Sequence, residues 1–388
     1  MTQSIGVSML PLGISDQEIK QRVARVQDKL RESGFAAVIC FGAHRDYWPG
    51  DIRYLSRWSC TDEETAYVFI PTEGSTTLVI DAEWDYDRAL TEACADEVVL
   101  DPEPAHTLVR LVSAAAGSGD TVGIGGFEAF PAPVYTRLQT ALPATQLTDC
   151  ASLLDEIKLI KSRSELELLR AAARITDAGM AAGIAEVRPG VSEAEVAAKA
   201  EYSIRRTGAE LSFVTVMGAG VRTAAATFFP QRRQMREGEY AILDCGARVE
   251  GYHGDMCRTV VVGGPSRRQR HVLETTAEAV RSAIDTARPG ATVRDVHDAA
   301  RSVVTAAGYE KSWWGYYMPH GFGTAQHEAP AGLRHGDMVL ADGMVICVEP
   351  GILLAGEGAV ILEQMVAVRA TGPETMNELP LNLWENVT

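Results

Sequence analysis

Residues 241–262, AILDCGARVEGYHGDMCRTVVV, have the pattern of a β-hairpin that carries acidic side chains. Two β-rich runs flank residues 249–251, which predicts an antiparallel hairpin centred there. This hairpin would set Asp244 directly opposite Asp255, with their Cβ atoms about 4.5–5.5 Å apart. Two carboxylates at that distance repel each other, or one takes up a proton, unless a cation lies between them. The hairpin therefore predicts a metal site on one face of a sheet.

A second acidic pair and a histidine repeat this arrangement further along the chain. The apolar runs MVICVEPG and AVILEQMVAV are joined by a Gly-rich loop, with Glu349 ending the first and Glu363 inside the second. A hairpin centred near Gly356 would again make the two carboxylates face each other. His320 lies in PHGFGTAQHEAP, whose glycines let the backbone approach a bound ion or substrate closely.

Four carboxylates and one imidazole form a ligand set for a pair of divalent ions such as Mn, Co, Fe or Zn. Two ions roughly 3.5–4 Å apart could share a hydroxide and stabilise a developing oxyanion. A single Asp in a hairpin is usually solvated, but an unpaired carboxylate in an apolar strand is costly. Five such residues in compatible contexts therefore favour a metal centre over five separate surface positions.

These motifs resemble those of the creatinase, prolidase and aminopeptidase P family. The resemblance rests on DCGARVEGYHGDMCRT, PHGFGTAQHEAP, CVEPG and ILEQMVAV, and on IKLIKSRSELELLRAAARI and RPGVSEAEVAA before them; it covers most of residues 18–370. It implies an α+β protein, with an N-terminal α/β creatinase-type domain over 1–152 and a catalytic pita-bread domain over 153–388. A helix from about 156 to 184 would open the second domain.

The same resemblance implies roles for individual residues. His327 would contact the substrate or intermediate, and Glu349 would shuttle a proton as well as bind metal. Creatinase itself has lost several ligands and works without metal, whereas this chain keeps all five. The implied ligands of the two divalent ions are Asp244, Asp255, His320, Glu349 and Glu363.

One departure from the family bears on the substrate. Peptidases of the family carry a further histidine before the first Asp motif, and Thr227 in GAGVRTAAATFFP occupies that position here. A threonine hydroxyl stabilises a tetrahedral species only weakly. An arginine expected just before the last Glu motif is also missing, because residues 360–362 are Val, Ile and Leu. The sequence therefore favours a hydrolase of a C–N bond in a small molecule or short peptide that is not a standard Xaa-Pro peptidase.

Three alternatives remain open at this stage. The first is a metal-dependent lyase of the same fold that acts on a small carboxylate, with Tyr316 or Tyr317 as its base. The second is an Xaa-Pro dipeptidase or aminopeptidase. The third is a binding module without catalysis, which the intact ligand set disfavours.

Several side chains are candidates for substrate contact, although each could equally be solvated or packed. In the family the N-terminal domain of one subunit can reach the active site of its partner, which implies a homodimer and makes basic residues in DIRYLSRWSC candidates. An arginine in GLRHGD resembles one that binds the substrate carboxylate in creatinase, and aromatic residues ahead of His320 could wall a pocket. His253 would share the strand face of Asp255. The candidates are Thr227, His253, Tyr316, Tyr317, Arg334, Arg53 and Arg57.

Composition limits the partners and the location. The formal net charge of −16 argues against nucleic acid and anionic membranes, because both require a basic patch. The seven cysteines form no CxxC pair and are odd in number, which is typical of reduced core residues in a cytoplasmic protein. No stretch approaches the roughly 20 apolar residues of a membrane span. We therefore expect a cytoplasmic enzyme.

Overall fold

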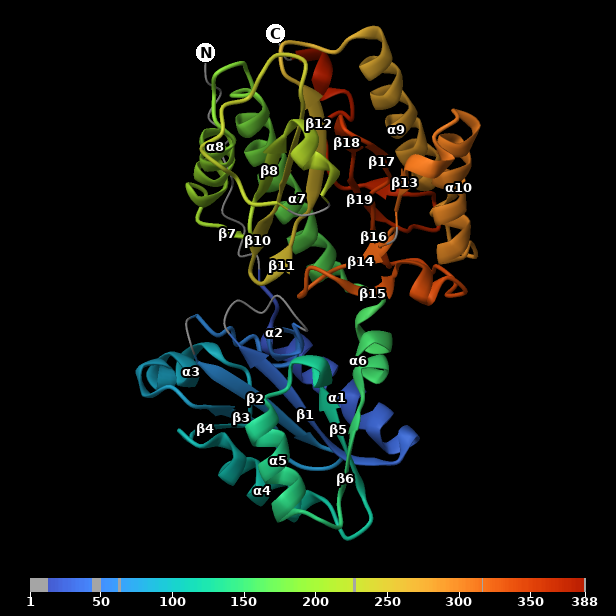
Figure 1. Ribbon diagram of the computed structural model, residues 1–388. Coiled ribbons are helices and arrows are strands. Elements are labelled where there is room, and N and C mark those ends of the chain that lie inside the picture. Colours follow the sequence, from blue (N-terminus) through green and yellow to red (C-terminus); the bar gives the residue numbers. More distant parts are fainter. Residues whose placement is uncertain (1–12, 44–49, 62–63, 226–227, 316, 387–388) are drawn as a thin grey trace.

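The computed structural model describes residues 13–43, 50–61, 64–225, 228–315 and 317–386, which form two lobes (Figure 1). The elements of the N-terminal lobe are the helices α1 (Asp16–Ser33), α2 (Asp51–Ser56), α3 (Tyr86–Glu92), α4 (Pro104–Ala115), α5 (Ala132–Ala141) and α6 (Ala151–Lys158), and the strands β1 (Phe35–Ala43), β2 (Thr65–Pro71), β3 (Thr77–Ile80), β4 (Glu97–Leu100), β5 (Thr121–Gly125) and β6 (Gln146–Asp149). The strands form one sheet in the order β4-β3-β2-β1-β5-β6, in which β1 is antiparallel to β2 and parallel to β5. This mixed sheet with its helices is the predicted α/β domain.

Apolar side chains of the central strand β1 fill two cores, one on each face of the sheet. Val38 and Cys40 pack with the α1, α2 and α6 side, whereas Ile39 and Phe41 pack with the α4 and α5 side. Alternate residues of a strand point to opposite faces, so a central strand covered on both sides is apolar throughout. The lobe is therefore a three-layer unit.

The C-terminal lobe contains several sheets lined by four helices. Its elements are the helices α7 (Arg163–Ile184), α8 (Glu193–Arg205), α9 (Arg267–Thr286) and α10 (Val293–Ala306), and the strands β7 (Glu210–Leu211), β8 (Val216–Ala219), β9 (Tyr240–Cys245), β10 (Ala247–Val249), β11 (Tyr252–His253), β12 (Met256–Val261), β13 (Trp313–Trp314), β14 (His320–Gly321), β15 (Glu328–Ala331), β16 (Val345–Val348), β17 (Gly351–Leu354), β18 (Gly358–Ile361), β19 (Gln364–Ala367) and β20 (Glu374–Thr375). Two antiparallel sheets that contribute residues to the site are β12-β9-β8 and β15-β14-β16-β19-β20. Helices α7 and α8 pack on the first half and α9 and α10 on the second, so the strands meet in the interior of the lobe (Figure 1).

The two lobes are joined by α6 and the short segment that follows it. The single helix predicted over 156–184 is wrong, because α6 ends at Lys158 and α7 begins only at Arg163. Ser162 explains the break: its hydroxyl accepts the backbone N–H of Glu165, whose carboxylate accepts the N–H of Ser162 in return. The domain division predicted after residue 152 falls inside α6 and stays a prediction. Among the described residues, no helix is both long and apolar enough to cross a membrane.

Candidate metal centre

The hairpin formed by β9 to β12 turns one residue later than the sequence analysis expects. Glu250 and Gly251 have φ angles of 50° and 84°, the left-handed conformations that a two-residue type I′ turn requires. The resulting register places Cys257 opposite Asp244. The prediction that Asp255 faces Asp244 directly is therefore wrong, because moving the turn by one residue displaces the partner by two.

A displacement by two residues leaves both aspartates on the same face of the sheet. Side chains two apart in a strand point the same way, so Asp255 and Cys257 lie together beside Asp244. Asp244, Asp255 and Glu363 each offer a carboxylate oxygen, and these oxygens lie within 4.8 Å of one another. The expected convergence is thus present although the direct pairing is not.

The second hairpin has the predicted centre. Leu354 pairs with Gly358, which places Gly356 in the middle of the turn, and further back Val348 pairs with Gln364. Glu349 directly follows Val348, and Glu363 directly precedes Gln364. The two glutamates therefore lie at matching ends of neighbouring strands.

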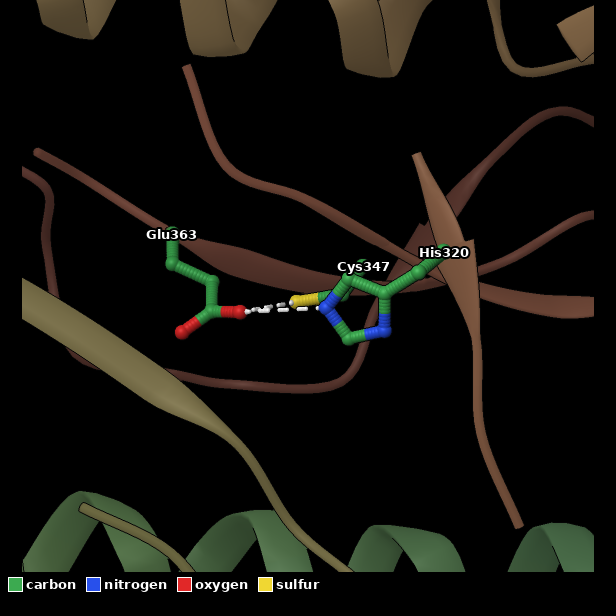
Figure 2. Close-up of side chains that lie close together, drawn as sticks. All are labelled: His320, Cys347 and Glu363. Carbon is green, nitrogen blue, oxygen red and sulfur yellow. Dashed lines mark hydrogen bonds and ion pairs between the residues drawn. The ribbon is translucent and has the colours of Figure 1, made fainter. Parts of the chain in front are cut away.

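His320 and Cys347, on the neighbouring strands β14 and β16, complete the centre. His320 in β14 pairs with Cys347 in β16, and both point toward Glu363 (Figure 2). The His320 Nε2 atom lies 3.7 Å from Glu363 Oε1, and the Cys347 thiol donates a hydrogen bond of 2.9 Å to the same oxygen. Cys257 occupies a similar place beside Asp244 and Glu349.

The two thiols are the part of the centre that the sequence analysis misses. It treats the cysteines as ordinary core residues, and Cys347 and Cys257 are indeed buried. Strand alternation could have placed them, because Cys347 is two residues from Glu349 and Cys257 is two residues from Asp255.

The electrostatics of the cluster fit bound cations. Burial raises the pKa of Asp244, Asp255 and Glu349 well above the usual carboxyl range, and neighbouring carboxylates raise it further. Asp244 Oδ1 and Glu363 Oε2 are buried without a hydrogen-bond partner among the described residues. Buried acidic oxygens of this kind are costly unless they coordinate metal. The donor set of carboxylates and imidazole therefore fits divalent ions.

His327 lies beside this cluster on the loop between β14 and β15. Its ring centre is 4.6 Å from that of His320, and burial together with His320 lowers the pKa of His327 to about 3. The ring of Tyr317, a residue that is 50% exposed, lies 6.1 Å from His327. Tyr317 thus lies at the outer side of the site. Tyr316 and Thr227 fall outside the described residues.

His253 lies two residues before Asp255 in a closed environment. It is fully buried, and its Nδ1 atom is 2.9 Å from the Ser212 hydroxyl. Burial, with a contribution from Arg248, lowers the pKa of His253 to about 3. Its backbone N–H donates to the carbonyl of Gly323, so it contacts the loop that carries His327. The predicted role in substrate binding stays a prediction.

Two of the arginines proposed for substrate contact bind other groups of this chain, Arg53 across the lobes and Arg57 within the N-terminal lobe. Arg53 Nε donates to the backbone carbonyl of Glu250 at the hairpin turn, and its Nη2 atom is 3.0 Å from the Glu250 carboxylate. Arg57 donates to the carbonyls of Glu92 and Ile14. Their contact with a substrate in a partner subunit stays a prediction.

The third arginine has a different environment. Arg334 is exposed in the short 3-10 helix Gly332–His335 that follows β15. The predicted contact of Arg334 with a substrate carboxylate stays a prediction.

Comparison with known proteins identifies the family. Residues 22–160 match the creatinase/prolidase N-terminal domain, and residues 167–370 match metallopeptidase family M24. The chain belongs to metallopeptidase family M24. The resemblance and the two-part fold with its pita-bread domain are thereby confirmed.

Among individual M24 relatives, the Xaa-Pro dipeptidase of Pyrococcus horikoshii is 32% identical over 224 residues, which are 58% of this chain and 64% of the relative. The putative dipeptidase YkvY of Bacillus subtilis is 31% identical over 248 residues, which are 64% of this chain and 68% of the relative. The alignment with the first thus spans slightly less than two thirds of its length.

Solved structures agree over nearly the whole chain. The Xaa-Pro dipeptidase of Bacillus anthracis has a TM-score of 0.81 and 27% identity, covering 93% of this chain and 98% of that one. The prolidase of Thermococcus sibiricus has a TM-score of 0.84 and 27% identity, covering 94% and 98%. Both lobes of this M24 protein, and their arrangement, therefore have counterparts in these enzymes.

Proposed function

We propose that this chain is a metal-dependent peptidase that hydrolyses the amide bond of dipeptides, with Xaa-Pro dipeptides as the first substrates to test. The observation that carries the proposal is the convergence of four carboxylates and one imidazole from two hairpins and β14. The names of the relatives favour the peptidase alternative over the main hypothesis from the sequence, a hydrolase of some other substrate. That hypothesis rested on Thr227, which lies outside the described residues, and on the arginine missing before the last Glu motif, where residues 360–362 are Val, Ile and Leu.

Five residues would hold the metal, which we propose to be two divalent ions of Mn, Co, Fe or Zn. When bound, the ions would supply an activated water and polarise the substrate carbonyl. The proposed ligands are Asp244, Asp255, His320, Glu349 and Glu363.

Two residues have further proposed roles. Glu349 is partly exposed, so its carboxylate can accept a proton from water and pass it to the leaving nitrogen. His327 can donate a hydrogen bond from its neutral imidazole to the oxygen that becomes negatively charged. Burial of the surrounding cluster strengthens such a bond because the local dielectric constant is low.

Metal analysis and a substrate panel test the proposal together. Purified protein should contain about two ions per chain and should cleave Ala-Pro or Gly-Pro, with Ala-Ala for comparison. Asp255→Ala should lose both metal and activity. Asp337→Ala is the matched control, because the Asp337 side chain is 96% exposed. Native protein without metal, or turnover that survives a chelator, would contradict the proposal.

Product masses separate the alternative chemistries. Hydrolysis adds the mass of water to the substrate atoms, whereas a lyase releases two products whose masses sum to that of the substrate. A cytoplasmic location and a homodimer also stay predictions; light scattering on purified protein measures the second.

A further inference from the structure

Two of the ion pairs buried where the lobes meet, outside the metal centre, involve lysines of α6 and of the segment that follows it. Lys158 Nζ lies 2.8 Å from Asp51 Oδ1, and Lys161 Nζ lies 2.8 Å from Glu328 Oε2. All four side chains are at most 5% exposed. Buried ion pairs are often no more stabilising than apolar side chains of similar size. Stability alone therefore does not explain these junction pairs, Asp51–Lys158 and Lys161–Glu328.

The second junction pair fixes a loop of the catalytic lobe. While Oε2 of Glu328 binds Lys161, Oε1 accepts the backbone N–H groups of Thr324 and Ala325 at 3.1 and 3.2 Å. Burial opposes ionisation of Glu328, but Lys161 and Lys158 outweigh it and lower its pKa to about 2. The ionised carboxylate of Glu328, at the end of the loop, thus binds Thr324 and Ala325 at its start.

This loop carries His327, the residue directly before Glu328. Successive side chains of an extended chain point to opposite sides. Glu328 accordingly points to the buried junction, whereas His327 points to the metal centre, 4.6 Å from the ring of His320. The backbone position of Glu328 is therefore coupled to that of the imidazole through one peptide unit.

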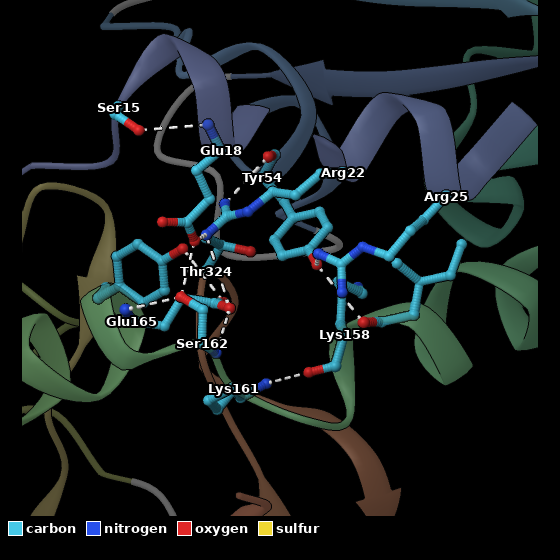
Figure 3. A network of polar contacts seen from close by, with 12 residues as sticks. Ser15, Glu18, Arg22, Arg25, Tyr54, Lys158, Lys161, Ser162, Glu165 and Thr324 are labelled. Carbon is cyan, nitrogen blue, oxygen red and sulfur yellow. Dashed lines mark hydrogen bonds and ion pairs between the residues drawn. The ribbon is translucent and has the colours of Figure 1, made fainter. Parts of the chain in front are cut away.

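We propose that Lys161 and Glu328 are positioning residues that hold His327 at the metal centre. This inference rests on the proposed function of the chain as a peptidase. Lys161 also donates to the carbonyl of Lys158, which links the two junction pairs (Figure 3). Through Asp51 at the start of α2, the N-terminal lobe takes part in the same arrangement.

The backbone of the N-terminal lobe contacts the same loop. A Cβ atom added at Gly50 would lie 2.5 Å from the carbonyl oxygen of Thr324. Only glycine permits this approach without movement. The loop is thus held by close packing against Gly50 of the N-terminal lobe and by Lys161 in the segment that follows α6.

A double-mutant cycle separates positioning of His327 from general stability. Lys161→Met replaces the unbranched side chain by one that is a single atom shorter and removes its charge and its hydrogen bonds. It should lower kcat between about tenfold and a hundredfold, the scale of a small misplacement of a reacting group. Metal content and KM should stay near those of wild type.

The decisive comparison is Lys161→Met in a His327→Ala background. If Lys161 acts through His327, adding Lys161→Met to the His327→Ala variant should change kcat by less than about twofold. If the two residues act independently, the two losses of activation free energy should add. Full additivity of the two losses would overturn the proposal.

Two further variants serve as control and substitute. Arg163→Met is the matched control, because Arg163 lies two residues away and its side chain is 93% exposed, paired with Glu167. It should leave kcat unchanged. If Lys161→Met does not fold, Glu328→Gln removes the charge with little change in shape and should show the same dependence on His327.

A spectroscopic measurement keeps the inference separate from the proposed function. If wild-type protein binds metal but cleaves no dipeptide, the peptidase proposal fails. NMR of the metal-bound protein with labelled histidine then reports the imidazole itself, with His327→Ala assigning the signal. Lys161→Met should shift the His327 signal and Arg163→Met should not; an unshifted signal would overturn the positioning role.

Discussion

Replacing Asp255 by asparagine should make the metal-free protein more stable and the metal-loaded protein less stable. Asp255 is 4% exposed, and burial, Glu363, Asp244 and Glu349 all raise its pKa. Asparagine nearly keeps the shape of the side chain but removes the charge. In the metal-free protein this relieves repulsion, whereas in the loaded protein it removes a ligand.

The pH dependence of the metal-free protein has a definite sign. A carboxyl with a raised pKa in the folded state contributes stability that is present at low pH and is lost as pH rises through that pKa. Each carboxyl that stays protonated in the folded state but ionises in the unfolded chain therefore costs about 1 kcal/mol per pH unit. Asp255→Asn should flatten this decline.

The size of the metal effect follows from mass action. An ion that binds only the folded state, at a hundred times its Kd, adds about 3 kcal/mol. For a domain of this size that corresponds to about 6–12 °C in Tm. Asp255→Asn should lose most of this shift.

Calorimetry at pH 6, 7 and 8, with chelator and with added Mn, Co or Zn, measures both effects. At pH 8 in chelator the variant should melt above wild type, and in metal it should melt below. Asp337→Asn, at an exposed site, should change neither curve. If Asp255→Asn lowers Tm in chelator as strongly as in metal, the reasoning about buried repulsion is wrong.

Two further substitutions test how the site is supported. Arg258 is fully buried and donates to four backbone carbonyls, including that of Glu363, and to one side-chain amide. Arg258→Lys leaves three donors for five acceptors, so urea unfolding should show a loss of about 2–6 kcal/mol; a loss below about 1 kcal/mol would contradict this count. Gly50→Ala should cost clearly more than Gly34→Ala in the same assay, because both glycines have φ near 70° but only the Cβ at Gly50 would meet the backbone of Thr324. Equal costs would show that the close approach is unimportant.

The convergence of the four carboxylates was predictable from the sequence because each lies in or beside a strand pattern with period two. For the second hairpin, symmetry about Gly356 suffices to bring Glu349 and Glu363 together. In the first hairpin, the turn position depends on whether Glu250 adopts a left-handed conformation, which an ordinary glutamate disfavours. The register was therefore missed by two residues, while the shared face was retained.

The junction pairs could not be predicted in this way. Lys158 and Lys161 lie in a charged, helix-like segment in which solvent exposure is the ordinary expectation. Their burial depends on Asp51 and Glu328, which are 107 and 167 residues away in the chain. Only the folded chain brings such partners together, so local sequence patterns cannot predict these pairs.

The contact between Arg53 and the hairpin turn at Glu250 limits how freely these domains can be recombined. That hairpin begins with Asp244 and returns to Asp255, so the contact of its tip with Arg53 of the N-terminal lobe braces the strands that carry two of the proposed metal ligands. A chimera that takes its N-terminal domain from a relative would need a side chain able to fill the place of Arg53 against Gly251. Domain exchange in this protein is therefore also a change to the scaffold of the proposed metal ligands.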